Sequence, residues 1–185
     1  GRFRASLGIA AAAPRRCACP AARRHSFLLI SALIVNAAAS ADSATDKAPV
    51  FTLPVLDGSK NVSLADYQGQ VVYVDFWASW CVECRGEAHV LEAFHQKQKT
   101  SDKPLTVLGI SIQDSEENAR AFARQFGKTY FLALDDPSGS IAMDYGIYGV
   151  PETFFIDAEG NIRHKQIGGV TATLLNQQKE ILFSL

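Results

Sequence analysis

Several protein classes are excluded by what this sequence lacks. It has no apolar run of 18 or more residues, which argues against a conventional membrane-spanning helix. It has no basic excess, because the net charge is −1, and so it lacks the electrostatic footprint of a nucleic-acid-binding protein. Four cysteines in 185 residues are too few for a disulfide-stabilised scaffold. With 48% hydrophobic and 20% charged residues, the composition is that of a globular protein.

The charged residues are distributed unevenly along the chain. Residues 1–41 contain six arginines and no acidic residue, whereas residues 42–185 carry a net charge of −7. The first part combines the basic pair Arg23-Arg24, an apolar stretch from Phe27 to Val35 and a small-residue cleavage pattern at 39–41. We therefore expect residues 1–41 to be a signal-peptide-like leader and residues 42–185 to form one domain. A core helix or a short membrane anchor is the alternative for the leader.

The hydrophobic patterns of the second part predict an α/β domain. The strands expected at 51–54 and 61–64 flank one turn sequence, and those expected at 153–156 and 162–167 flank another. Each of these two pairs of strands is expected to form a hairpin. The strands between them alternate with helices, which is typical of a largely parallel sheet. Strands are expected at 51–54, 61–64, 71–77, 105–112, 130–134, 153–156 and 162–167, and helices at 82–97, 116–126, 138–145 and 171–182.

The clearest chemical signal is the pair Cys81 and Cys84. It follows the buried strand expected at 71–77 and opens the helix expected at 82–97. Unpaired backbone N–H groups at a helix N-terminus lower the pKa of a thiol placed there. The two-residue spacer puts both sulfurs on one side of the first turn, close enough to form a disulfide. We expect Cys81 to be the exposed nucleophile and Cys84 the buried resolving thiol.

Other roles for this cysteine pair are less well supported. A zinc site needs four ligands, and no second pair of suitably spaced ligands is present. A structural disulfide across so short a loop would stabilise the fold little. A Cu(I)-binding metallochaperone that uses Cys81 and Cys84 stays open, because thiolates suit Cu(I), although Met143 is the only methionine. The remaining cysteines, Cys17 and Cys19, lie in the expected leader.

Three segments resemble the thioredoxin-fold proteins of the TlpA/ResA/DsbE (CcmG) group. Residues 74–81 (VDFWASWC) look like the active-site strand and turn, and residues 49–69 resemble the N-terminal hairpin. Residues 145–157 (YGIYGVPETFFID) are similar to the cis-proline segment of the DsbE subgroup. The resemblance covers residues 48–182. It implies a thioredoxin-like fold, with a central mixed sheet flanked by helices, an N-terminal β-hairpin and a central βα insertion.

The resemblance also implies roles for residues around the cysteines. Val150-Pro151 would form a cis peptide facing the active site, and Trp80 belongs to the matching active-site motif. Asp75 would assist proton transfer to the inner thiol, Glu87 would shuttle protons near the disulfide, and Glu152 would shape partner contacts. From the residues alone, a backbone-satisfied Asp75 and solvated surface positions for Glu87 and Glu152 stay open.

The implied function is that of an exported thiol–disulfide oxidoreductase with a redox-active Cys81–Cys84 disulfide and neither metal nor cofactor. It would receive electrons from a membrane DsbD- or CcdA-type protein. It would then reduce disulfides of periplasmic proteins, with apocytochrome c as the favoured substrate. The protein would be periplasmic, or membrane-tethered if the leader at 1–41 is retained. A thiol peroxidase is disfavoured, because the P-x-x-x-T-x-x-C arrangement of peroxiredoxins is absent.

Overall fold

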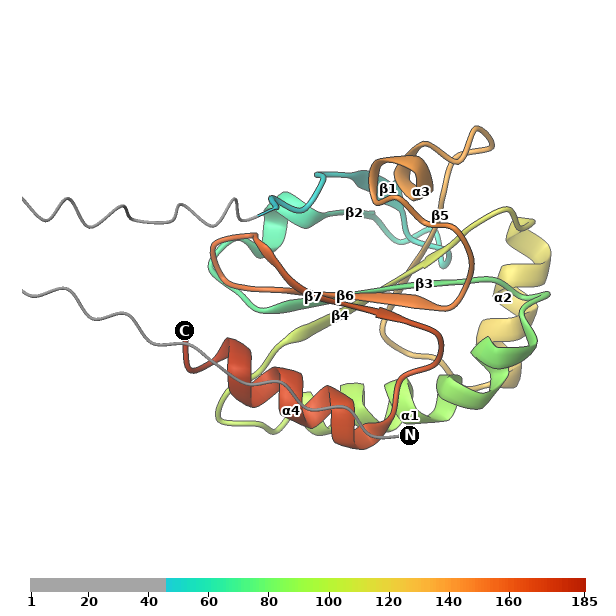
Figure 1. Ribbon diagram of the computed structural model, residues 1–185. Helices are drawn as coiled ribbons and strands as arrows, with labels where there is room; N and C mark the ends of the chain where they lie inside the picture. Colours follow the sequence, from blue (N-terminus) through green and yellow to red (C-terminus); the bar gives the residue numbers. More distant parts are fainter. Residues whose placement is uncertain (1–45) are drawn as a thin grey trace, which may run out of the picture. The chain divides into compact units, whose positions relative to one another are not determined.

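A five-stranded mixed sheet forms the centre of the domain, in the order β5-β4-β3-β6-β7 (Figure 1). The computed structural model describes residues 46–185, so the leader expected at 1–41 lies outside the described residues. The central strand β3 runs parallel to β4 and antiparallel to β6, and β7 adds an antiparallel edge, as the hairpin patterns predict. The strands are β3 (Val72–Trp77), β4 (Thr106–Ser111), β5 (Phe131–Leu134), β6 (Glu152–Ile156) and β7 (Ile162–Ile167).

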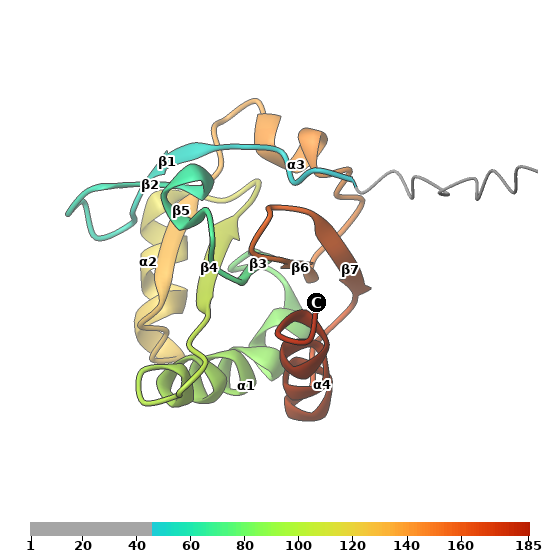
Figure 2. The ribbon, with the colours of Figure 1, turned by 90° about the vertical axis from the view of Figure 1, so that its left-hand side faces the viewer.

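Different elements cover the two faces of this sheet. Helices α1 (Val82–Gln98) and α4 (Ala172–Leu182) lie side by side on one face, and α2 (Glu116–Gln125) packs on the same face (Figure 1 and Figure 2). The hairpin of β1 (Thr52–Pro54) and β2 (Asn61–Ser63) covers the other face together with α3 (Ser140–Asp144). The predicted thioredoxin-like architecture is confirmed.

Strand β3 separates two hydrophobic cores. Its side chains alternate between the faces of the sheet, as in any strand. Val72, Val74 and Phe76 enter the core beneath the hairpin, whereas Tyr73 and Trp77 enter the core beneath the helices. Because both faces are covered, all six residues of the strand are buried, which explains its nearly continuous apolar sequence.

The helix ends agree with their sequence signals. The hydroxyl of Ser115 accepts a hydrogen bond from the Asn118 N–H at 3.2 Å and so caps α2. Gly127 follows this helix with a φ of +64°, a conformation that glycine adopts without steric cost. The short 3-10 helix Leu64–Tyr67, which no sequence pattern predicted, follows β2. Within residues 46–185, no helix combines the length and apolar character needed to cross a bilayer.

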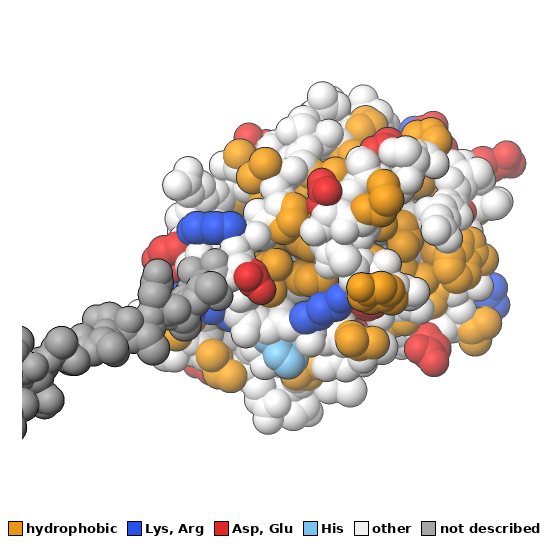
Figure 3. All heavy atoms as spheres, turned by 45° about the horizontal axis from the view of Figure 1, so that its top comes forward, with side chains coloured by type: hydrophobic (Ala, Val, Ile, Leu, Met, Phe, Trp, Pro, Cys, Tyr) orange, Lys and Arg blue, Asp and Glu red, His pale blue; other side chains and the backbone are white. Residues whose placement is uncertain are grey.

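The surface of the face that carries the hairpin and α3 is mixed in character. Hydrophobic side chains lie there in several groups, with single acidic and basic side chains between them (Figure 3). Such a surface offers no continuous basic area to a polyanion. The two cysteines lie between the end of β3 and the first turn of α1.

Candidate active site

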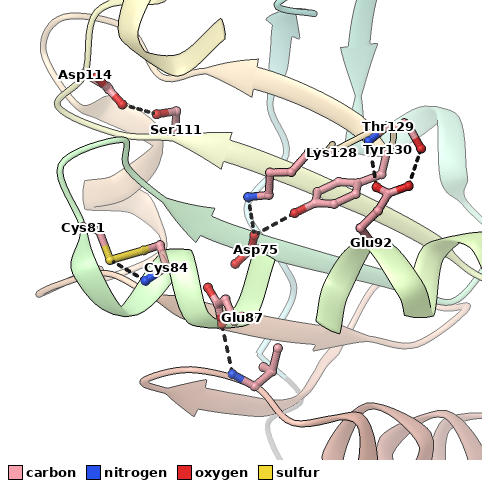
Figure 4. A network of polar contacts seen from close by, with 11 residues as sticks. Asp75, Cys81, Cys84, Glu87, Glu92, Ser111, Asp114, Lys128, Thr129 and Tyr130 are labelled. Carbon is pink, nitrogen blue, oxygen red and sulfur yellow. Dashed lines mark hydrogen bonds and ion pairs between the residues drawn. A yellow bond between two sulfur atoms is a disulfide. The ribbon is translucent and has the colours of Figure 1, made fainter. Parts of the chain in front are cut away.

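The two cysteines lie where β3 ends and α1 begins, and a disulfide joins them (Figure 4). Cys81 is the N-cap residue of α1, and its Sγ accepts a hydrogen bond from the Cys84 N–H at 3.0 Å. The Cys81 sulfur therefore faces the positive end of the helix dipole. This is the position in which a thiolate is stabilised after the disulfide is reduced.

Cys81 is less exposed to solvent than the sequence predicts. Cys84 is fully buried, as predicted, but Cys81 is only 5% exposed rather than open to solvent. Val150 covers it from the loop before β6, where the Val150 carbonyl oxygen lies 3.5 Å from Cys81 Sγ. The peptide bond between Val150 and Pro151 is cis, as the resemblance implied. A partner that reacts with Cys81 therefore has to approach it beside the loop that carries Val150.

Exposed apolar side chains lie next to Cys81 and in the loop before β6. Trp80, directly before Cys81, is half-exposed, and Val82 is more open still. Tyr148, in the loop that carries the cis peptide, is 97% exposed. Large aromatic and aliphatic groups left in solvent next to a reactive residue are typical of a protein–protein contact surface.

A pair of opposite charges lies buried behind the disulfide. The Asp75 carboxylate, on β3, lies 3.7 Å from Lys128 Nζ, and both side chains are fully buried. Asp75 also accepts a hydrogen bond from the Tyr130 hydroxyl at 3.4 Å. Burial raises the pKa of Asp75, although the nearby ammonium acts in the opposite direction. The alternative of a backbone-satisfied Asp75 is wrong, because its partners are side chains.

Sequence reasoning missed Lys128. Its ammonium lies 4.0 Å from the centre of the Trp77 ring and within 6 Å of the rings of Phe122 and Tyr130. Burial lowers the pKa of Lys128, and Asp75 raises it in part. The only signal in the sequence was indirect: an aspartate inside an apolar strand requires a partner, but the strand pattern does not say which residue provides it.

Glu87 lies on the inner face of α1, one turn after Cys84. It is 3% exposed, so the surface alternative is wrong. Its Oε2 accepts a hydrogen bond from the Val170 N–H at 2.9 Å, and its carboxyl group points into the space between α1 and Asp75 (Figure 4). Burial and the neighbouring Asp75 raise the pKa of Glu87 to about 9. At neutral pH this side chain therefore holds a proton close to the disulfide.

Glu152, the first residue of β6, is also buried, so its solvated alternative is wrong. Its Oε2 lies 2.6 Å from Lys165 Nζ, and its Oε1 accepts a hydrogen bond from the Tyr148 N–H at 3.4 Å. Lys165 in turn donates to the Gly146 carbonyl. Through Tyr148 and Lys165, Glu152 therefore restrains the loop between Gly146 and Pro151.

Among residues 46–185, no group of three or more histidine, cysteine, aspartate or glutamate side chains is arranged to hold a metal ion. The site does contain a disulfide at a helix N-terminus, a buried charged pair behind it and a protonated carboxyl group beside it. These are the components of thiol–disulfide exchange with internal proton transfer.

Comparison with known proteins finds relatives that are named thiol:disulfide interchange proteins. Residues 44–165 match the AhpC/TSA family. The thiol:disulfide interchange protein DsbE of Pseudomonas fluorescens biotype C is 38% identical over 120 residues, which are 65% of this chain and 64% of that protein. DsbE of Allochromatium vinosum is 38% identical over 126 residues, 68% of this chain and 67% of that protein. CycY of Rhizobium leguminosarum bv. viciae, also named a thiol:disulfide interchange protein, is 34% identical over 137 residues, 74% and 68% of the two chains.

Solved structures agree with these relatives. The thioredoxin domain of a thiol-disulfide oxidoreductase from Bacteroides vulgatus matches with a TM-score of 0.63 and 28% identity, over 75% of this chain and 96% of that one. A thioredoxin-family thiol:disulfide interchange protein from Chlorobium tepidum TLS, 24% identical, matches with a TM-score of 0.69 over 77% and 99% of the chains, which shows the shared fold. The family expected from the three sequence segments is confirmed, and the chain belongs to the AhpC/TSA family, among the DsbE thiol:disulfide interchange proteins.

Proposed function

We propose that the protein is an exported thiol–disulfide oxidoreductase that reduces disulfides of periplasmic proteins through Cys81 and Cys84. The observation that carries this proposal is the disulfide at the N-terminus of α1, with Cys81 Sγ beside the Val150 carbonyl. The names of the relatives, thiol:disulfide interchange proteins, support disulfide-containing proteins as the substrate class.

The proposed reaction begins with the reduced protein. The Cys81 thiolate attacks one sulfur of a substrate disulfide; the substrate S–S bond breaks, and the released thiolate takes up a proton. The Cys84 thiolate then attacks Cys81 Sγ in the mixed disulfide and releases the second substrate thiol. Two electrons and two protons pass to the substrate. The protein is left with the Cys81–Cys84 disulfide, which a dithiol donor of the DsbD or CcdA type in the membrane would reduce again.

The buried acids have a role in the second step. Cys84 must lose its proton before it can attack, and it is shielded from solvent. Asp75 and Glu87 are the acidic groups on its inner side (Figure 4). We assign proton acceptance to Asp75, because the Lys128 ammonium 3.7 Å away favours its ionised form, whereas the pKa of Glu87 is raised to about 9. Glu87 then serves as a proton reservoir beside the pair.

The finer assignment is reduction of apocytochrome c during cytochrome c maturation. The support is the DsbE-like segment at 145–157 and the DsbE and CycY relatives. The apolar rim of Trp80, Val82 and Tyr148 suits an unfolded polypeptide segment around a cysteine pair. We place the protein in the periplasm, free after removal of residues 1–41 or tethered to the membrane through them.

The reduction potential of Cys81 and Cys84 tests the direction of electron flow. The full chain is equilibrated in glutathione or dithiothreitol buffers, and the peptide that contains both cysteines is followed by mass spectrometry. A potential below about −200 mV supports a reductant, since thioredoxin lies near −270 mV. A value near −120 mV, close to that of DsbA, would assign the protein to disulfide formation instead. A pair without redox activity whose reduced form binds Cu(I) would replace the proposal by the metallochaperone.

Trapping experiments test the substrate. Cys84→Ser leaves Cys81 able to attack but removes the resolving thiol, so a mixed disulfide with an oxidised apocytochrome c peptide should accumulate. Cys81→Ser, which keeps the buried thiol alone, is the matched control and should accumulate none. Equal trapping of unrelated oxidised peptides would contradict a preference for apocytochrome c without affecting the oxidoreductase proposal.

A further inference from the structure

The turn that leads from β3 into α1 is stabilised by contacts with residues of another loop. The turn, Ala78–Cys81, contains neither proline nor glycine, and the spacer between the cysteines has no proline either. One backbone hydrogen bond, from the Cys81 N–H to the Ala78 carbonyl at 3.2 Å, closes it. Its local sequence therefore provides little stiffness.

Asp114 supplies the missing restraint from the loop between β4 and α2. Its Oδ2 accepts hydrogen bonds from the Ser79 N–H at 2.7 Å and the Ser111 hydroxyl at 3.0 Å. Its Oδ1 accepts from the Ser79 hydroxyl at 2.8 Å and the Ser115 N–H at 2.9 Å. The carboxylate thus joins the active-site turn, the end of β4 and the start of α2. Figure 4 shows its contact with Ser111. Both oxygens of Asp114 act as acceptors, and together they receive four hydrogen bonds.

The residue before Asp114 extends this restraint to Trp80. The Gln113 carbonyl accepts a hydrogen bond from the Trp80 indole N–H at 3.0 Å. Gln113 has a φ of +48°, in the left-handed region that residues with a Cβ atom rarely occupy. Such a conformation persists only where surrounding contacts enforce it, and Asp114 makes those contacts next to it. The two residues that precede Cys81 are therefore each bonded to this loop.

We infer that Asp114 is a positioning residue for thiol–disulfide exchange, which acts on Cys81 through Ser79 and, by way of Gln113, through Trp80. The inference rests on the proposed oxidoreductase function. It explains how Cys81 Sγ is kept on the Cys84 N–H and beside the Val150 carbonyl by a turn with little stiffness of its own. Preorganisation of this kind decides how well a helix N-terminus stabilises a thiolate.

The sign of a pH shift separates positioning from simple charge. A carboxylate near a thiol disfavours the thiolate, so loss of its charge alone would move the ionisation of Cys81 to lower pH. Loss of positioning has the opposite effect, because a mobile Cys81 no longer keeps its sulfur on the helix N-terminus. Asp114→Asn removes the charge and half of the accepting capacity with almost no change in volume.

The experiment measures the pH profile of Cys81 alkylation by iodoacetamide in the reduced full chain. Peptide mass spectrometry separates Cys81 from the other three cysteines. For Asp114→Asn we expect the midpoint to move to higher pH and mixed-disulfide formation with oxidised glutathione at pH 7 to slow at least about threefold. Acrylamide should also quench the fluorescence of Trp80 more strongly, while the buried Trp77 contributes little change.

Asp157→Asn is the matched control. The Asp157 carboxylate also accepts several hydrogen bonds within a turn, from the Asn161 N–H at 2.8 Å and its side-chain amide at 3.0 Å. It follows Ile156, which pairs with Val72, and so it lies at the end of β3 away from the cysteines. Any general effect of losing such a carboxylate appears in both variants, whereas the alkylation midpoint should move only in Asp114→Asn.

Three results would overturn the inference: a midpoint that moves to lower pH, one that does not move, or one that moves equally in Asp157→Asn. If Asp114→Asn does not fold, Ser79→Ala removes one of the four donors and should move the midpoint in the same direction by less. These profiles are read on the reduced thiol. A wild-type protein without exchange activity would therefore refute the proposed function and still leave the role of Asp114 measurable.

Discussion

Replacement of Lys128 by methionine removes the ammonium that lies 3.7 Å from the Asp75 carboxylate and keeps most of the aliphatic side chain. Two unit charges at this separation attract each other by about 4–5 kcal/mol at an effective dielectric constant of about 20. Removal of one partner from a buried pair generally costs about 3–5 kcal/mol, since the other charge is left without compensation. Asp75 can escape part of this cost by taking up a proton. We therefore expect Lys128→Met to lower the unfolding free energy by about 3 kcal/mol at pH 8.

The pH dependence of this loss has a defined sign. Without Lys128, the pKa of folded Asp75 rises further above its value in the unfolded chain. The folded protein then keeps a proton that the unfolded chain releases above about pH 4. Stability of Lys128→Met should consequently fall, relative to wild type, as the pH rises from 5 to 8. Urea unfolding of the oxidised proteins across this range measures it.

A double-mutant cycle with Asp75→Asn isolates the pair. In the Asp75→Asn background, Lys128→Met removes a buried ammonium that already lacks its counter-ion, so the second substitution should cost little. We expect a coupling energy of about 2–3 kcal/mol. If the losses of the two single variants add within about 0.5 kcal/mol, the pair does not interact as described, and the reasoning is refuted.

Two further predictions concern Glu87 and the glycines Gly109 and Gly86. Because the pKa of Glu87 is raised to about 9, the folded protein keeps a proton that the unfolded chain loses, and the stability of the wild type should decline between about pH 4.5 and pH 9. Glu87→Gln should make this decline smaller. Unfolding curves of both proteins at pH 5 and pH 8 test it. Gly109→Ala should lower the unfolding free energy by about 1–3 kcal/mol, because the added Cβ would lie 2.7 Å from Leu132 Cδ2. Gly86→Ala, which has open space around it in α1, should raise the unfolding free energy by about 0.5–1 kcal/mol. Comparable urea midpoints for the two variants would contradict this.

The order and type of the main elements could be predicted from the sequence because local physics decides them. The strand at 71–77 is apolar almost throughout since both faces of the sheet are covered, and a strand in the middle of a layered domain has that pattern. Ser115 and Gly127 mark the ends of α2 through capping and backbone freedom, which act within one helical turn. The disulfide pair was predictable for the same reason.

The polar groups around the disulfide could not be predicted, because distant segments satisfy them. Asp75 required a partner, but Lys128 enters the core only after α2 has crossed the face of the sheet. The burial of Glu87 depends on the backbone of Val170, which belongs to the segment before α4. The burial of Cys81 was not predicted, because Val150, which covers it, belongs to a loop distant in the sequence. Each of these contacts is tertiary, and no local pattern encodes it.

The shortness of the disulfide loop connects redox chemistry to folding in a simple way. Only two residues separate Cys81 from Cys84, so closure of this loop restricts the unfolded chain very little. In a thermodynamic cycle, the difference in unfolding free energy between the oxidised and reduced protein equals the difference in reduction potential between the folded and the unfolded pair. About 30 mV corresponds to about 1.4 kcal/mol. Two denaturation curves, one for each redox state, therefore report how far the fold itself shifts the potential, without any redox buffer.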